Sequence, residues 1–199
     1  MPYYTRLFSK SSETASVDQL RASLPNKFYV NVTSGPEARW KELIVTAIDG
    51  REVCLVERNE CGRDDLAADE IEEFAEAQDD AEPRPAAKWI KSYLADCRSV
   101  YACQFLRALS DGDLGEVPSL VMWSIRRLVG GIGQTDGEGF SNEEGYQVTW
   151  DFSDNVTGSW NMAVLVSPDQ WQHFEMDLGD GAHRAAFRAG RVTDGAKSK

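Results

Sequence analysis

The sequence predicts an α+β protein in which helices pack on a mostly antiparallel sheet. Three observations lead to this fold class. Several segments alternate apolar and polar residues or are rich in β-branched and aromatic residues, as strands are. The Asp49-Gly50 pair between two apolar runs is a strong short-range signal of a hairpin. Other segments repeat apolar residues at helical spacing.

The first third of the chain is expected to be mostly sheet. Ser16 and Gln19 have the spacing of a capping box, which predicts a short helix that ends before Pro25. Around this helix, β-branched and aromatic residues predict strands at 3–8, 28–33, 40–48 and 52–57. The last two strands flank Asp49-Gly50 and form the expected hairpin.

Helices are expected in the middle of the chain, and strands return after it. Apolar spacing predicts helices over 65–81, 89–97 and 117–128. Asp64 or Asp65 is expected to be the N-cap of the first of these helices. The glycine-rich segment 130–139 follows a helix, whereas a dinucleotide-binding fingerprint follows a strand, so it is interpreted as a helix stop and a turn. The remaining expected elements are strands at 99–106, 146–152, 160–166 and 171–177, and a helix at 182–189.

These elements can be grouped in two ways. In the first, residues 1–192 form one compact α+β domain, and residues 193–199 form a disordered tail. In the second, residues 1–97 and 98–192 form two similar halves of order β-α-β-β-β-α, although no sequence repeat relates them. A chain of 199 residues is long enough for either arrangement.

Cysteine usage and the N-terminal sequence predict a cytoplasmic location. The chain begins without the charged and apolar regions of a secretory signal, and no apolar run has the length of a membrane span. Cys54, Cys61, Cys97 and Cys103 are therefore expected to be reduced thiols. Their spacing differs from that of zinc sites, so they are interpreted as small buried side chains.

Acidic residues are concentrated in two blocks of a chain whose formal charge is −12. Residues 57–82 contain twelve acidic residues against two arginines, and residues 128–183 contain ten acidic residues and no Lys or Arg. This distribution argues against nucleic acid as a partner, because phosphate contacts need clustered Lys and Arg. It favours either solubility alone or an acidic surface that steers a basic protein partner.

Candidate binding residues lie in the second acidic block. The loop 136–144 crowds polar acceptors around one aromatic residue, and aromatic residues are dense in the strands that follow. An ordinary solvated loop and cross-strand aromatic packing are the simpler interpretations. The candidate ligand- or partner-binding residues are Asp136, Glu138, Phe140, Glu143, Glu144, Trp150, Trp160 and Trp171.

A divalent cation is the single cofactor that the sequence suggests. His173, Glu175 and Asp177 alternate on one expected strand, so their side chains would share one face and could bind a metal. The opposite face would carry core residues, and a polar outer face explains the same pattern. The sequence contains no H-E-x-x-H, G-x-S-x-G or P-loop motif, which removes the common hydrolase and nucleotidase templates.

The sequence leaves three functions open. The first is a non-catalytic protein-binding module, of the inhibitor or immunity kind, for a basic partner. The alternative is a protein or enzyme that uses carboxylates of the C-terminal half to bind a small ligand or a divalent metal. The third is a homo-oligomer that pairs exposed strand edges. No membrane partner is expected.

Overall fold

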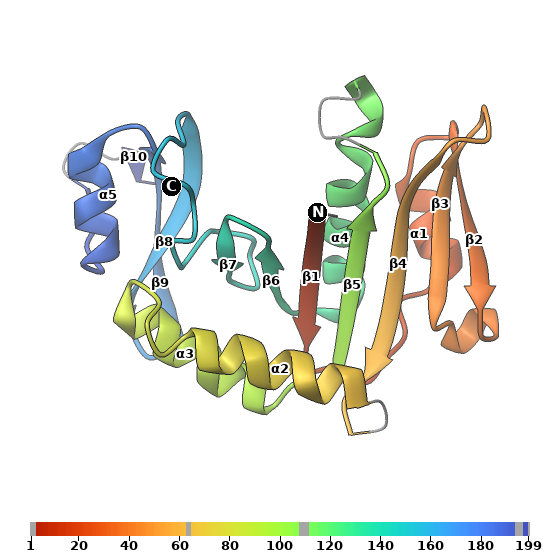
Figure 1. The fold of residues 1–199 in the computed structure, drawn as a ribbon, viewed down its shortest axis with the longest axis horizontal. Coiled ribbons are helices and arrows are strands. Elements are labelled where there is room, and N and C mark those ends of the chain that lie inside the picture. Colours follow the sequence, from red (N-terminus) through yellow and green to blue (C-terminus); the bar gives the residue numbers. More distant parts are fainter. Residues whose placement is uncertain (1–2, 63–64, 108–111, 194–196, 199) are drawn as a thin grey trace. The chain divides into compact units, whose positions relative to one another are not determined.

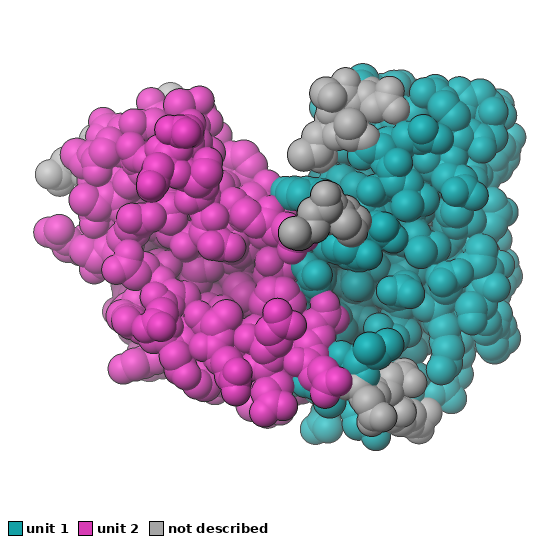
Figure 2. Space-filling view, in the orientation of Figure 1, with its two compact units in different colours: residues 1–68, 97–131 teal, residues 69–96, 132–199 magenta. Residues whose placement is uncertain are grey.

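The computed structural model describes residues 3–62, 65–107, 112–193 and 197–198, and its fold is α+β, as predicted. The chain divides into two compact units, each built from two separate stretches of sequence (Figure 2). Unit 1 comprises Met1–Ala68 and Cys97–Gly131, and unit 2 comprises Asp69–Asp96 and Ile132–Lys199. Whether residues 1–192 form one domain, or 1–97 and 98–192 two similar halves, stays a prediction.

The described residues of unit 1 form five strands in the spatial order β2-β3-β4-β5-β1, with antiparallel neighbours (Figure 1). The predicted hairpin at Asp49-Gly50 joins β3 to β4, and Gly50 has a φ of +84°, a conformation that glycine adopts at low cost. The strands are β1 (Tyr3–Ser9), β2 (Phe28–Ser34), β3 (Glu42–Ala47), β4 (Glu52–Glu60) and β5 (Ser99–Phe105).

The described part of unit 1 also contains two α-helices, α1 (Val17–Ser23) and α4 (Val117–Val129), and two short 3-10 helices, Glu37–Arg39 and Gly112–Leu114. The Ser16 hydroxyl caps α1 by accepting the backbone N–H of Gln19, as the capping-box spacing predicts. The helix α4 packs against α1, β1, β4 and β5 and ends at the predicted glycine pair. Gly131 is required there, since a Cβ at this position would lie 2.6 Å from the carbonyl oxygen of Phe8.

The interior of unit 1 combines a buried indole with a buried guanidinium. Trp40 is fully buried, donates from Nε1 to the Ala15 carbonyl at 2.8 Å and meets Tyr101 edge to face. Arg58 is 3% exposed and donates to the Tyr101 hydroxyl, to Glu60 and to the Ser12 carbonyl. These contacts tie β4 and β5 to the segment between β1 and α1.

The described part of unit 2 contains a three-stranded sheet of order β10-β9-β8, the β6–β7 hairpin outside that sheet, and three helices (Figure 1). Its largest pairing is the antiparallel β8–β9 hairpin, whose buried residues Phe174 and Met176 pack with Phe187 of α5. The helices are α2 (Asp65–Ala77), most of which lies in this unit, α3 (Arg84–Ala95) and α5 (Gly181–Arg188). The strands are β6 (Ile132–Thr135), β7 (Gly139–Ser141), β8 (Ser159–Ser167), β9 (Gln170–Asp177) and β10 (Lys197–Ser198).

The strand predicted at 146–152 is wrong. Only Gln147 forms isolated bridges there, because the following backbone N–H groups go to different partners. The Val148 N–H donates to the Phe140 carbonyl, and the Trp150 N–H donates to the Glu82 carbonyl. Burial of Val148 and Trp150 explains the apolar pattern without a strand.

The structure also differs from the sequence-based prediction at three places: the glycine-rich segment, the end of the helix predicted over 65–81, and the C-terminal tail. The segment expected to be a turn contains the β6–β7 hairpin. The helix expected over 65–81 ends at Ala77, and Asp64 lies outside the described residues. Within the tail, Lys197–Ser198 pairs with β9, while 194–196 and 199 lie outside the described residues. Among the described helices, none has the length and apolar composition of a membrane span.

Candidate functional site

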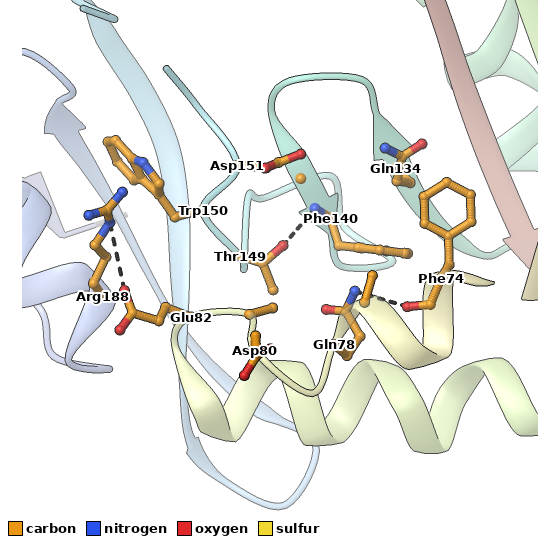
Figure 3. Close-up of a pocket in the computed structure, with 13 residues that line it drawn as sticks. Phe74, Gln78, Asp80, Glu82, Gln134, Phe140, Thr149, Trp150, Asp151 and Arg188 are labelled. Carbon is orange, nitrogen blue, oxygen red and sulfur yellow. Dashed lines mark hydrogen bonds and ion pairs between the residues drawn. The ribbon is translucent and has the colours of Figure 1, made fainter. Parts of the chain in front are cut away.

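A pocket of about 410 Å³ lies within unit 2 (Figure 3). Its lining comes from the C-terminal end of α2 and the turn that follows, from β6 and β7, from residues 149–151 and from α5. This volume falls in the range of natural small-ligand sites. The pocket therefore gathers segments that are far apart in the sequence around one space.

One wall of the pocket is aromatic. The Phe74 and Phe140 rings meet edge to face, with their centroids 5.8 Å apart. The Phe140 backbone N–H donates to the Thr149 hydroxyl at 2.7 Å, which fixes β7 against residues 149–151. Gly139 allows this approach, because its φ is +101° and a Cβ would lie 2.8 Å from the Thr149 hydroxyl oxygen.

Gln78 contributes a buried hydrogen-bond acceptor to the pocket. Its side chain is 7% exposed and donates from Nε2 to the Phe74 carbonyl at 3.1 Å. Within the described part of the chain, its Oε1 is buried and has no hydrogen-bond partner. In Figure 3 this amide faces the space between the end of α2 and β7. Buried amide oxygens are nearly always paired in folded proteins, so this oxygen is open to a hydrogen bond from a bound ligand or a water molecule.

Carboxylates outnumber cations among the charged groups of the lining. Asp80, Glu82 and Asp151 line the pocket together with Arg188. The Arg188 Nε lies 3.8 Å from the Glu82 carboxylate, and its guanidinium lies 5.3 Å from the centroid of the Trp150 ring. The Asp80 carboxylate is exposed to solvent and lies 3.7 Å from Arg84. Arg188 and Glu82 offset each other, so Asp151 leaves the pocket with a net negative charge.

Asp151 has a perturbed ionisation. Partial desolvation of its carboxyl group raises the pKa of Asp151, and the nearby Asp136 carboxylate adds to the shift. The carboxylates of Asp151 and Asp136 repel each other when both are ionised. A cation bound beside Asp151 would relieve this repulsion.

The structure brings some predicted site residues to this pocket and leaves others away from it. Phe140 and Trp150 line it, and Asp136 acts on it through Asp151. The Glu138 carbonyl accepts from the side chain of Gln147 at 2.7 Å, which supports the same segment.

Other predicted residues belong to an aromatic cluster of α3, β9 and the 142–146 turn. Trp171 meets Trp89 edge to face at 5.0 Å, and Glu143 accepts from the Tyr93 hydroxyl at 2.9 Å. Glu144 lies 3.5 Å from His173. Trp160 packs elsewhere, on Phe152. Packing between helix and strand and between neighbouring strands thus explains why these aromatic and acidic residues lie where they do.

The three residues predicted to bind a metal share one face of β9, but each has a separate partner. His173 stacks on Tyr146 with centroids 4.0 Å apart. Glu175 accepts from the Ser159 hydroxyl, and Asp177 accepts from the Gly179 N–H. Across the described residues, no group of three or more His, Cys, Asp or Glu side chains is arranged to hold a metal ion.

Several pocket residues carried no functional signal in the sequence. Phe74 matched the apolar face of a helix, and Asp80 and Glu82 were part of a long acidic block. Gln78 and Arg188 belong to no motif. Their role follows from the turn after α2 and from the position of α5, which periodicity alone does not reveal.

The four cysteines are free thiols, and three of them are buried, as predicted. Cys61 is half-buried at the end of β4. A hydrogen bond from the Cys97 thiol lowers the pKa of Cys61, and the charge of Arg98 adds to the shift. The same hydrogen bond and burial raise the pKa of Cys97. Cys61 is therefore the most reactive thiol of the four.

We predict that iodoacetamide alkylates Cys61 at least about tenfold faster than the other three cysteines in native buffer, because it combines access with thiolate character. Mass spectrometry of digests taken over time measures the order of labelling. Cys61→Ser should remove the fast phase, and urea should expose Cys54, Cys97 and Cys103. Early labelling of Cys54 or Cys103 would contradict the burial seen in unit 1.

Comparisons of the chain with protein-family models, with curated proteins and with solved structures find no match. The function is therefore inferred from the residues of the chain itself.

Proposed function

We propose that this chain is a non-catalytic binding module, of the inhibitor or immunity kind, that engages a basic protein partner through unit 2. One observation carries the proposal: the pocket of unit 2 combines an aromatic wall, an unpaired buried acceptor and an excess of carboxylates. Such a set of groups is complementary to a cation with an apolar stem.

The charge distribution supports the same partner class. The stretch 128–183 has ten acidic residues and no Lys or Arg, and all of it from Ile132 onward belongs to unit 2. Fields of one sign speed the encounter with a partner of opposite charge. The charge of unit 2 therefore favours fast association, and the pocket supplies a place for a specific contact.

The four free cysteines support a cytoplasmic location as part of this proposal. The raised pKa of Asp151 favours one alternative, a small-ligand enzyme that uses this carboxyl group for proton transfer. The two functions differ in their salt dependence, because a neutral substrate would bind equally well at low and high ionic strength.

Association kinetics test the proposal. We expect a short peptide rich in arginine and glycine to associate with the protein at a rate that falls roughly tenfold from about 20 mM to about 300 mM NaCl. Stopped-flow fluorescence with a labelled peptide measures this rate. A peptide of the same length with glutamate in place of arginine serves as the control. An association rate that does not change with salt would count against the proposal.

A further inference from the structure

We propose that the pocket of unit 2 receives an arginine side chain of the basic partner. This inference rests on the proposed function and names the chemical group that the pocket recognises. The groups that carry it are the unpaired Gln78 oxygen, the Asp151 carboxylate and the Phe74–Phe140 wall.

The unpaired oxygen of Gln78 can accept a hydrogen bond from a ligand. Its Oε1 is buried at the pocket while the Nε2 of the same amide is held by the Phe74 carbonyl, which fixes the direction of the oxygen. A ligand that donates a hydrogen bond to Oε1 satisfies an acceptor that the protein leaves unpaired. A carboxylate group offers no such donor and would pair instead with the indole N–H of Trp150, which also lines the pocket and is buried without a partner in the described part of the chain.

The charges of the pocket select a cation over an anion. Glu82 and Asp151 line the pocket with one guanidinium, that of Arg188, which lies 3.8 Å from Glu82 and 5.3 Å from the centroid of the Trp150 ring. Asp80 also lines the pocket, but its carboxylate is exposed to solvent and lies 3.7 Å from the Arg84 guanidinium. A cation near Asp151 also offsets the repulsion between Asp151 and Asp136. An incoming carboxylate or phosphate would add to the negative charge.

A guanidinium fits these groups better than an ammonium does. It is planar, carries five N–H donors in a fixed fork, is weakly hydrated and stacks on aromatic rings. The pocket offers acceptors of three kinds, an amide oxygen, carboxylates and aromatic faces, on different sides of one space. A lysine ammonium is a compact, strongly hydrated charge that would gain less from leaving water.

Isothermal titration calorimetry with three matched peptides tests the inference on the intact chain. The peptides carry one arginine, one lysine or one citrulline at the same central position of a mildly basic sequence. Citrulline keeps the shape of arginine and lacks its charge. We expect the arginine peptide to bind about tenfold tighter than the lysine peptide and more tightly still than the citrulline peptide.

Two pocket variants and one control variant locate the binding. Gln78→Leu removes the acceptor by placing an apolar side chain of similar size there. Asp151→Asn removes the negative charge with little change of shape. Each should weaken binding of the arginine peptide by about tenfold. The control Glu73→Gln removes an exposed carboxylate of α2 that does not line the pocket, and it should change the affinity less than about twofold. Circular dichroism of each variant verifies the fold.

The outcomes separate the two proposals. Tight arginine binding that is lost in both folded pocket variants supports the inference. Equal affinity for arginine and lysine peptides, or arginine binding that survives both substitutions, overturns the inference and leaves the basic-partner function in place. Failure of any basic peptide to bind at low salt overturns the proposed function as well.

Discussion

Trp40→Ala is expected to lower the free energy of unfolding by about 4 kcal/mol, the usual cost of removing a large buried aromatic side chain. The ring is 0% exposed and packs edge to face on Tyr101. The substitution also leaves the Ala15 carbonyl without its hydrogen bond from the indole Nε1. Urea unfolding followed by far-UV circular dichroism measures the change without relying on tryptophan fluorescence.

Trp123→Ala is the matched control. This tryptophan lies on α4 and is 44% exposed, with the Arg126 guanidinium as its cation–π partner. Removing it should change the free energy of unfolding by no more than about 0.5 kcal/mol, as expected for an exposed site. Equal losses in the two variants would contradict the structure of unit 1.

Arg58→Met is expected to cost about 3 kcal/mol, at the lower end of the range for removing one partner of a buried ion pair. The guanidinium is 3% exposed, and its loss leaves the Ser12 carbonyl without a donor. The cost stays at the lower end because Glu60 is 20% exposed and keeps its bond from Arg39. Urea unfolding at neutral pH measures the effect.

Acid titration separates the charge of this network from its packing. Hydrogen bonds from Arg39 and Arg58 lower the pKa of Glu60 to about 2, from an ordinary value of 4.5. Because the folded state holds the proton less tightly, this stabilisation is fully present above pH 4.5 and is lost as the pH falls towards about 2.

Glu60→Gln should therefore reduce stability at neutral pH and flatten the stability profile between pH 4.5 and about 2. Glu57→Gln supplies the control, since it removes an exposed carboxylate of the same strand that lies outside this network. A Glu60→Gln profile that stays parallel to the wild-type profile would show that the network does not act through this charge.

Most elements were predictable from local patterns. Alternating burial along β3, with Leu43, Val45 and Ala47 inside, reproduces the period-two pattern of its sequence. The Ser16 cap and the Gly130 end of α4 are likewise set by residues within a turn of the helix end. Such features depend on neighbours in sequence and need no knowledge of the rest of the fold.

The segment 146–152 shows where local patterns fail. Its apolar residues are buried as a strand's would be, yet its backbone partners come from Phe140, Glu82 and Glu138. The pocket also depends on long-range contacts, because Gln78, Phe140 and Asp151 line it from the turn after α2, from β7 and from residues 149–151. Of the predicted binding residues, Phe140 and Trp150 reached the pocket, whereas Trp171, Glu143 and Glu144 joined an aromatic cluster.

The sequence by itself determined the α+β class, most helices and strands, the hairpin at Asp49-Gly50 and the two acidic blocks. Periodicity, turn chemistry and charge are properties of neighbouring residues, so they can be read without a fold. Only the tertiary structure decided that Gln78 keeps an unpaired oxygen, that Arg188 lies beside Glu82 and Trp150, and that Asp151 lines the same pocket as two aromatic rings. The physical reason is that pairing and burial depend on residues distant in sequence, which fix the net charge and the open hydrogen bonds of a pocket.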